Sequence, residues 1–427
     1  MTSLPALPHE LFLQISKQLE LIDKVRLSAT CKQYRTQFVP EIFKTIYFSS
    51  SKASARSAHA AVKAHGDHTS RIEFTGHSDS GDLLTGTSLP LTASYLLEGH
   101  FTPNLHTVRL RFDFDFDDGE YWDSNMNGGG SIYLFEEIET EDFVREEEEA
   151  WKWRALMRET WQSLSAADDV RELILDDFIP KWTSTFDTEM FRQFLSQLES
   201  ATFNILGMDN GAGWMTNTQD GYTEFLRNLD TSFLHHMSGL KHLHIKAGDP
   251  LGLDGYRYVP LALKPDDLPV LQTLKLENCF VGPELVWFVH SHAQVLTSLG
   301  VKECYSAGDG GGMADNPIYW AQFFDFIYEA KPALTEFVAG GDEVFLAYDD
   351  EPETKRVRDV RRKLKDNPGL KLFGYGYLSD KYGSLHYNVE ENVRQFIDGG
   401  DQRAYDRLMG LVKENAAQMG NEHGHTG

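Results

Sequence analysis

The sequence is short of cysteine, of positive charge and of long apolar runs. Its 427 residues include three cysteines, Cys31, Cys279 and Cys304, too few for a disulfide framework or for a zinc site built of four thiolates. Lysine and arginine number 40 against 65 aspartate and glutamate residues, a net charge of −25. Such a charge opposes nucleic acids and anionic membranes wherever it is evenly spread. We therefore expect no nucleic-acid or membrane partner and a reducing compartment, cytoplasmic, nuclear or both.

The chain nevertheless holds enough apolar material for a folded core. It has 8 Trp, 17 Tyr and 27 Phe residues, which rule out disorder as the global state. No stretch approaches the roughly 20 apolar residues that cross a bilayer, and the first residues lack a basic region followed by an apolar one. The length suits one large domain and one small one, and we expect a soluble chain without a secretory signal.

Motifs that carry chemistry are also lacking. We find no glycine-flanked serine nucleophile, paired-histidine metalloprotease motif or dinucleotide fingerprint. No Lys-Ser or Lys-Thr follows the glycine-rich stretch 308–312, and His290, His292, His423 and His425 lack neighbours in sequence that would complete a metal site. We predict no catalytic residue, no metal and no cofactor, although a missing motif does not exclude an enzyme.

Three aspartates resemble the start of a calcium loop. Asp113, Asp115 and Asp117 match the first, third and fifth ligands of an EF-hand. Asp118 stands where the loop needs glycine, and Ser124 stands where it needs a bidentate glutamate. The pattern favours a solvated strand face over a calcium site, with a docking surface for a basic ligand as the functional alternative.

The N-terminal residues have a four-residue apolar period. Asp23 interrupts the series in phase, and it can cap a helix that begins at Lys24. The period is typical of short helices with one buried face, so we predict a compact unit of three helices. The apolar members of the series are Leu7, Leu11, Ile15, Leu19, Leu27 and Cys31.

The same stretch resembles the F-box motif. The matching pattern is Leu7-Pro8-x-Glu10-Leu11-x-x-x-Ile15-x-x-x-Leu19-x-x-x-Asp23-x-x-x-Leu27-x-x-x-Cys31-Lys32-x-Tyr34-Arg35, with Tyr34 where many members carry tryptophan. Pro40-x-x-Phe43-x-x-Ile46 is similar to the continuation common in fungal F-box proteins. The alternative is the first helical hairpin of a globular domain.

The resemblance implies a partner and a set of contact residues. The partner is a Skp-type adaptor and, through it, a cullin. Leu7 and Pro8 would insert into the adaptor. The full set of adaptor-binding residues that the resemblance implies is Leu7, Pro8, Leu11, Ile15, Leu19, Leu27, Cys31, Tyr34 and Arg35.

A leucine-rich phrase recurs through the rest of the chain. Its clearest copies are Leu240-x-x-Leu243-x-Ile245, Leu271-x-x-Leu274-x-Leu276-x-x-Cys279 and Leu296-x-x-Leu299-x-Val301-x-x-Cys304. Looser copies begin at Leu105, Val170, Leu198 and Leu334, and Ile72-x-Phe74 is a degenerate start. Phrases at such spacing are typical of stacked repeats. Segments with helical apolar spacing lie between them, at 188–198, 222–234, 283–289 and 318–330.

These phrases resemble the cysteine-containing leucine-rich repeats that accompany F-boxes. The predicted fold class is α/β, with a three-helix F-box followed by an irregular leucine-rich-repeat-like solenoid that has parallel strands on one face and helices on the other. An ordinary α/β domain is the alternative.

The expected boundaries follow from composition. We expect the F-box at 1–48, the repeat domain at 49–385, capping helices at 386–419 and a disordered tail at 420–427. The repeat domain includes an acidic insertion at 113–149, where fifteen acidic residues stand against one basic residue. A last strand near 372–378 would close the array.

The combined prediction is a substrate-recognition subunit of a Skp/cullin/F-box ubiquitin ligase. It would bind an adaptor at one end and an unknown protein target through the repeats. The alternatives are an adaptor-bound scaffold without a role in ubiquitination, and an enzyme whose site lies in the repeat-domain insertions.

Overall fold

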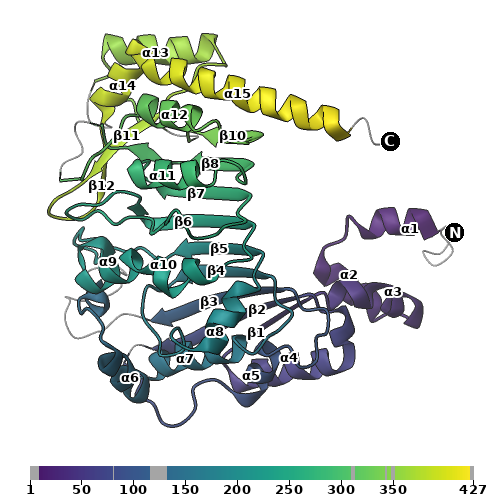
Figure 1. Ribbon diagram of the computed structural model, residues 1–427. Helices are drawn as coiled ribbons and strands as arrows, with labels where there is room; N and C mark the ends of the chain where they lie inside the picture. The colour runs from purple at the N-terminus through teal and green to yellow at the C-terminus, as the bar shows by residue number, and fades with distance from the viewer. Residues whose placement is uncertain are drawn as a thin grey trace.

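A nine-stranded parallel sheet forms the body of the protein. The computed structural model describes residues 9–79, 81–115, 132–308, 313–341, 344–347 and 352–423. The strands follow one another across the sheet in chain order and run parallel throughout (Figure 1). They are β1 (Thr45–Ser49), β2 (Arg71–Asp79), β3 (Thr107–Asp115), β4 (Glu172–Phe178), β5 (Ser200–Ile205), β6 (His242–Leu251), β7 (Thr273–Cys279), β8 (Ser298–Lys302) and β10 (Glu336–Ala339).

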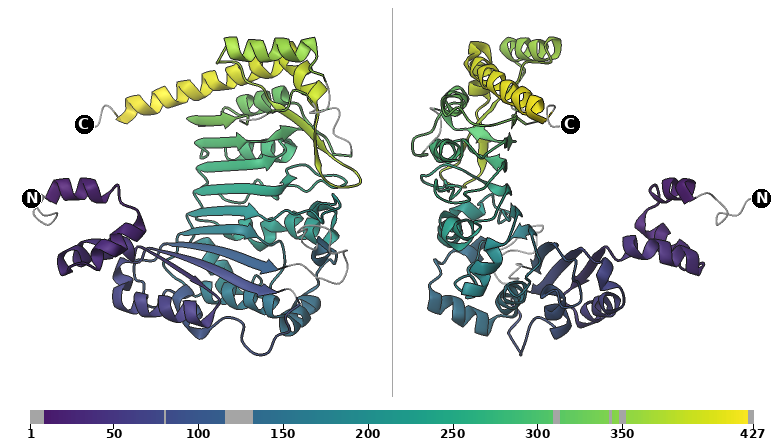
Figure 2. Two further views of the ribbon diagram at one scale, coloured as in Figure 1. Left: turned by 180° about the vertical axis from the view of Figure 1, so that it is seen from behind. Right: turned by 45° about the vertical axis from the view of Figure 1, so that its right-hand side comes forward.

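Helices cover one face of this sheet, and the other face is left uncovered (Figure 2). Helices coincide with the four segments of helical apolar spacing, although the one expected at 222–234 is divided at Asn228. The connecting helices are α4 (Lys52–His65), α5 (Leu91–Leu97), α6 (Glu141–Ala150), α7 (Lys152–Leu164), α8 (Glu189–Ser196), α9 (Asp220–Arg227), α10 (Leu229–Ser232), α11 (Pro283–Ser291) and α12 (Trp320–Glu329). The mixed α/β class with parallel strands is therefore as predicted.

The recurring phrase places apolar side chains at equivalent positions in the strands that carry it. Its second and third apolar positions point to the helix-covered face, where they are buried and in register from strand to strand, as Leu243, Leu274 and Leu299 are. Its first position is buried just before the strand begins, as at Leu240. Cys279 is buried at the end of β7, where a small side chain fits between neighbouring turns.

The first strand was not predicted. Ile46 and Phe48 are buried and pair with Ile72 and Phe74 of β2, so β1, which falls within the N-terminal unit predicted at 1–48, belongs to the sheet. Ile46 was predicted to belong to the continuation of the N-terminal motif rather than to a strand. A strand of five residues is too short to stand out against that assignment.

The last predicted strand exists but does not extend the main sheet. β11 (Gly374–Leu378) pairs with β12 (Leu385–Tyr387) and β9 (Tyr305–Ser306) in a small second sheet. Phe373 is buried beside Trp320, whose indole Nε1 donates to the Gly374 carbonyl at 2.8 Å. This packing turns the chain away from β10.

The C-terminal helices extend further than predicted. α13 (Lys355–Asp366), α14 (Val389–Asp398) and α15 (Gly400–His423) end the described chain. The capping helices begin after β12 at Val389 rather than at 386. Because α15 reaches His423, the disorder expected at 420–423 is wrong, and 424–427 lie outside the described residues.

Half of the acidic insertion is part of the packed structure. Phe112 and Phe114 are buried while Asp113 and Asp115 are exposed, as the alternation predicts; Asp117, Asp118 and Ser124 lie outside the described residues. The segment 132–150 packs inward and buries two of its glutamates. The insertion is therefore not wholly a solvated acidic surface.

Each buried glutamate holds the loop after β4. Glu139 accepts hydrogen bonds from Lys181 Nζ at 2.9 Å and from the Trp182 backbone N–H at 3.0 Å, and it lies 3.0 Å from Arg154 Nη2. Glu148 accepts from the Ser184 backbone N–H at 2.8 Å and from its hydroxyl at 2.6 Å. Burial lowers the pKa of the Lys181 ammonium, and the Glu139 carboxylate opposes that effect.

The hairpin of β11 and β12 reaches back to the loop that follows β5. The Met215 N–H donates to the Tyr382 carbonyl at 2.9 Å, and the Asn217 amide donates to the Gly383 carbonyl at 2.9 Å. Gly383 has a φ of +72°, and a Cβ there would lie 1.8 Å from Asn217 Oδ1, so the contact requires glycine. The hairpin thus joins the C-terminal part of the chain to the middle of the sheet.

The buried carboxyl of Asp249 holds the backbone of Asn217, which makes this contact. Asp249 Oδ2 accepts from the Asn217 N–H at 2.8 Å, and burial raises the pKa of Asp249 to about 7. In the unfolded chain this group ionises near pH 4. Its contribution to stability is therefore fully present below pH 4 and is lost as the pH rises through 7.

Asp249→Asn removes this titration and retains an acceptor for the Asn217 N–H. Between pH 6 and pH 8, the free energy of unfolding of the variant should rise by about 1.4 kcal/mol relative to wild type, the value of one pKa unit. Urea titrations of both proteins at the two pH values measure the difference, in which the titration of the other carboxylates cancels. A difference that does not change with pH would contradict the assignment.

Candidate adaptor-binding surface

Three helices precede the sheet and stand off its edge near β1 (Figure 2). They are α1 (His9–Ser16), α2 (Leu21–Ser28) and α3 (Lys32–Ile42). α2 and α3 pack around Tyr34 and Phe38, with half-buried apolar side chains beside them at Leu19, Leu27, Cys31 and Ile42. This small cluster is separate from the main core.

The local sequence explains the helix boundaries. α2 begins at Leu21, so the expectation that Asp23 caps a helix starting at Lys24 is wrong. Asp23 lies instead in the first turn, where the helix dipole stabilises a negatively charged carboxylate. Its carboxylate also pairs with the Arg26 guanidinium at 3.2 Å. Lys24 Nζ joins α2 to α3 through Glu41 at 2.6 Å.

Backbone contacts attach the unit to the body. The Thr69 hydroxyl donates to the Phe43 carbonyl at 2.9 Å, and the Arg71 N–H donates to the Lys44 carbonyl at 3.1 Å. The Phe43 ring stacks on the His65 ring at 4.2 Å between centroids. These contacts lie where α3 leads into β1, and they do not cover the apolar side chains of α1.

Two of the predicted contact residues are exposed on α1. Leu11 is 47% exposed and Ile15 is 43% exposed, and they lie one helical turn apart on one face. Arg35 of α3 is also exposed. Leu7 and Pro8 lie outside the described residues.

The remaining predicted residues lie inside the unit. Tyr34 is buried, and Leu19, Leu27 and Cys31 are half-buried around it. The structure therefore brings these four side chains together in a small core. They are less exposed to a partner than Leu11 and Ile15 are. Their effect on a partner would be exerted by holding α2 and α3 together.

An apolar face on α2 lies outside the predicted set of contact residues. Leu21, Ile22 and Val25 are all exposed, and no residue of α2 is buried. Their spacing of one and three residues is that of a helix face, but they fall outside the four-residue series and were not selected. Apolar side chains gathered on one small unit mark a contact surface.

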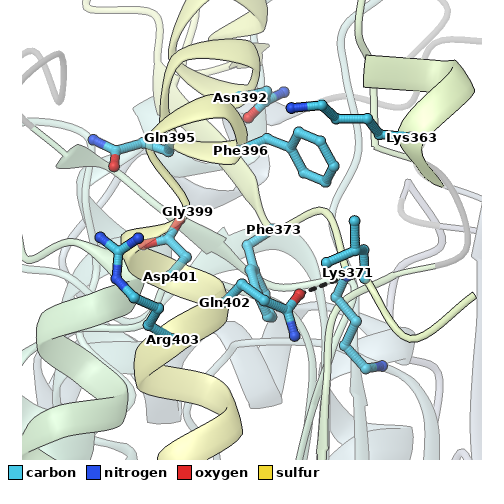
Figure 3. A pocket seen from close by; sticks show the side chains of 11 residues that line it. Lys363, Lys371, Phe373, Asn392, Gln395, Phe396, Gly399, Asp401, Gln402 and Arg403 are labelled. Carbon is cyan, nitrogen blue, oxygen red and sulfur yellow. Dashed lines mark hydrogen bonds between the residues drawn. The ribbon is translucent and has the colours of Figure 1, made fainter. Parts of the chain in front are cut away.

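One cavity in the C-terminal part holds a carboxyl with an altered pKa, which is the feature that the enzyme alternative calls for. It measures about 230 Å³ and lies between the ends of α13, α14 and α15 (Figure 3). Burial raises the pKa of Asp401 to about 6. Asp401 accepts from the Tyr375 hydroxyl at 2.8 Å and from the Ala321 N–H at 2.9 Å. These contacts fix the start of α12, which is a structural role.

One of the histidines considered as a metal ligand lies in the core. His292 is buried with both ring nitrogens at backbone carbonyls, Phe288 at 2.9 Å and Asp267 at 2.9 Å. Within the described ranges, His, Cys, Asp and Glu side chains form no group of three that could hold a metal ion. No helix of the described chain has the length and apolarity needed to cross a bilayer.

Comparison with known proteins identifies the N-terminal unit. Residues 4–40 match the family model of the F-box domain. No curated protein matches the sequence. The matched residues end within α3, before the sheet begins. The three-helix unit is therefore an F-box domain, which implies binding to the Skp-type adaptor of an SCF-type ubiquitin ligase.

Proposed function

We propose that this protein is the substrate-recognition subunit of a Skp/cullin/F-box ubiquitin ligase. The F-box domain holds the adaptor, the adaptor holds the cullin, and the remaining domain holds a protein target. The observation that carries the proposal is the match at residues 4–40 on a unit whose apolar residues Leu11, Ile15 and Ile22 face outward.

The exposed apolar side chains explain why such a unit needs a partner. Three short helices cannot bury all their apolar faces against one another. Burial of a leucine or isoleucine side chain is worth about 1.5–3 kcal/mol. An adaptor that covers the exposed apolar faces of α1 and α2 would therefore gain affinity, because it removes these side chains from water.

We propose a leucine-rich-repeat-like solenoid of the type found in fungal F-box proteins for the target-binding domain. Its support is the order of the strands, each beside its chain neighbour, with strict or looser copies of the leucine-rich phrase at the starts of β3 to β8 and β10. α14 and α15 would cap the last repeat. Such a domain presents a long surface on which scattered side chains recognise a partner.

The function requires binding and no chemistry from this chain. When the target is held near the enzyme that carries ubiquitin, transfer becomes effectively intramolecular. The proposed location is the cytosol, the nucleus or both, where the thiols of Cys31, Cys279 and Cys304 stay reduced. Co-purification of a cullin with the chain distinguishes a ligase subunit from a scaffold that binds only the adaptor.

Leu11→Asp/Ile15→Asp should weaken binding to a purified Skp-type adaptor by at least about tenfold, because each lost burial is worth more than 1 kcal/mol. Isothermal titration measures the affinity, and circular dichroism checks the fold. Ile22→Asp/Val25→Asp tests the face that sequence reasoning missed, and Trp287→Asp on α11, 65% exposed, is the matched control. The proposal fails if wild type does not bind, or if the control loses as much affinity as the α1 variant.

Tyr34→Ala should act through stability. Removal of a buried aromatic side chain costs about 3–5 kcal/mol, so the three-helix unit should unfold at lower temperature and adaptor affinity should fall with it. Arg35→Ala, at an exposed neighbouring position, should leave the unfolding temperature unchanged. Calorimetry of both variants measures this, and a Tyr34→Ala protein with wild-type unfolding and reduced affinity would place Tyr34 in direct contact with the adaptor instead.

A further inference from the structure

α13 is strongly basic in an acidic chain. Its twelve residues hold seven lysines and arginines against two aspartates, whereas the whole chain has a net charge of −25. Val357 and Val360 are buried and Leu364 is half-buried, so one stripe of the helix faces the body. The basic side chains occupy the rest of the circumference and are exposed, at Lys355, Arg356, Arg358, Arg361, Arg362, Lys363 and Lys365.

Much of this charge is not neutralised. Arg361 pairs with Glu353 at 2.9 Å, and Arg362 pairs with Asp359 at 2.8 Å. Ion pairs among the described residues include none from the lysines of the helix, from Arg356 or from Arg358. This leaves five cations without a carboxylate partner there, namely Lys355, Arg356, Arg358, Lys363 and Lys365. Arg358 donates instead to the backbone carbonyl of Glu353 at 2.8 Å.

The uncovered face of the sheet differs in this respect. Its charged side chains largely pair with one another across neighbouring strands. Examples are Arg111 with Asp177 at 3.1 Å and Arg109 with Asp176. Attraction for an anionic partner is therefore concentrated on α13 rather than on the strands.

A groove lies beside the basic helix, between the first turn of α13 and one side of α14 from Val389 to Ile397. Its volume is about 600 Å³, within the range of sites that enclose ligand groups. Its base is made of the buried side chains of Leu346, Val357, Val389 and Val393, and half-exposed Ile397 forms part of its wall.

The rim of this groove is charged. Arg356 and Arg394 line it, together with Glu390. Arg394 is held by Glu391 at 2.6 Å, whereas Arg356 has no ion pair among the described side chains. Lys363, two turns beyond Arg356, extends the basic rim to the cavity on the other side of α14, where Figure 3 shows it beside Phe396. The groove thus combines an apolar base with an incompletely paired cation.

The acidic helix α6 lies far from the groove. α13 and α14 lie at one end of the molecule and the acidic helix α6 lies at the opposite end (Figure 1). The F-box helices are also distant from α13. The described carboxylates next to the helix, Glu353 and Asp359, already pair with Arg361 and Arg362. We therefore assign the complementary charge for the remaining cations to another protein.

We propose that α13 and this groove dock an acidic segment of a partner protein. Carboxylates of the segment pair with the unneutralised cations of α13, and an apolar side chain of the segment enters the groove. The apolar base favours a peptide over a nucleic acid, whose phosphates would find only the rim. The inference rests on the proposed function, since the partner that it describes is the target held for ubiquitination.

The test uses the full chain and a labelled twelve-residue peptide of alternating glutamate and leucine, with binding followed by fluorescence anisotropy. Wild type should bind the peptide at 50 mM salt and at least about tenfold more weakly at 300 mM, because exposed pairs are screened. Arg356→Glu/Lys363→Glu should lose at least about tenfold in affinity, since attraction becomes repulsion at two positions. Lys246→Glu/Lys275→Glu, with the same charge change on the uncovered sheet face, is the matched control and should bind as wild type does.

A second variant tests the apolar contact. Ile397→Asp should weaken binding of the glutamate–leucine peptide several-fold and leave unchanged the weaker binding of a peptide with serine in place of leucine. The proposal is overturned if wild type does not bind the peptide at 50 mM salt, if the control pair loses as much affinity as the α13 pair, or if single-stranded DNA or anionic vesicles bind more tightly than the peptide. Adaptor binding by the α13 variants should remain intact, so failure here is distinguishable from failure of the F-box assignment.

Discussion

The structure depends on the burial of a repeated apolar ladder under one face of a parallel sheet. A parallel strand cannot be joined to its neighbour by a tight turn, so every strand needs a crossover, and here each crossover returns beside the strand it left. From β3 onward, an apolar residue before the strand and two apolar residues within it fill the space under the helices, as Leu271, Leu274 and Leu276 do. The result is a long, stiff body that keeps its two ends apart.

This separation of ends organises the proposed function. The F-box domain is attached at the first strand by a few backbone contacts and has its own small core around Phe38, so its apolar face stays available. At the other end, the hairpin after Gly374 ties the C-terminal helices to the middle of the sheet through Asn217. In the proposed function, the body would act as a spacer that holds an adaptor and a target in a fixed relation, which is what transfer by proximity needs.

The parts of this arrangement that could be predicted are those with a repeated local signal. The strands at Leu173 and Leu243 follow from a phrase that recurs, and the F-box follows from fixed spacing. The strand at Ile46 has no such repetition, and the turn after Phe373 depends on packing against an indole 53 residues away in the sequence. Burial of Tyr34 could not be read from the motif either, because a motif records which residues recur and not which side of the helix a partner covers.

The central claim is that the exposed faces of α1 and α2 are covered by a Skp-type adaptor. Hydrogen exchange of the full chain, measured alone and with the purified adaptor, tests it most directly. The account predicts that backbone amides of α1 and α2 exchange more slowly in the complex, while those of β4 to β8 do not change. Binding that leaves 9–28 unprotected, or protection that appears on the sheet instead, would contradict the account.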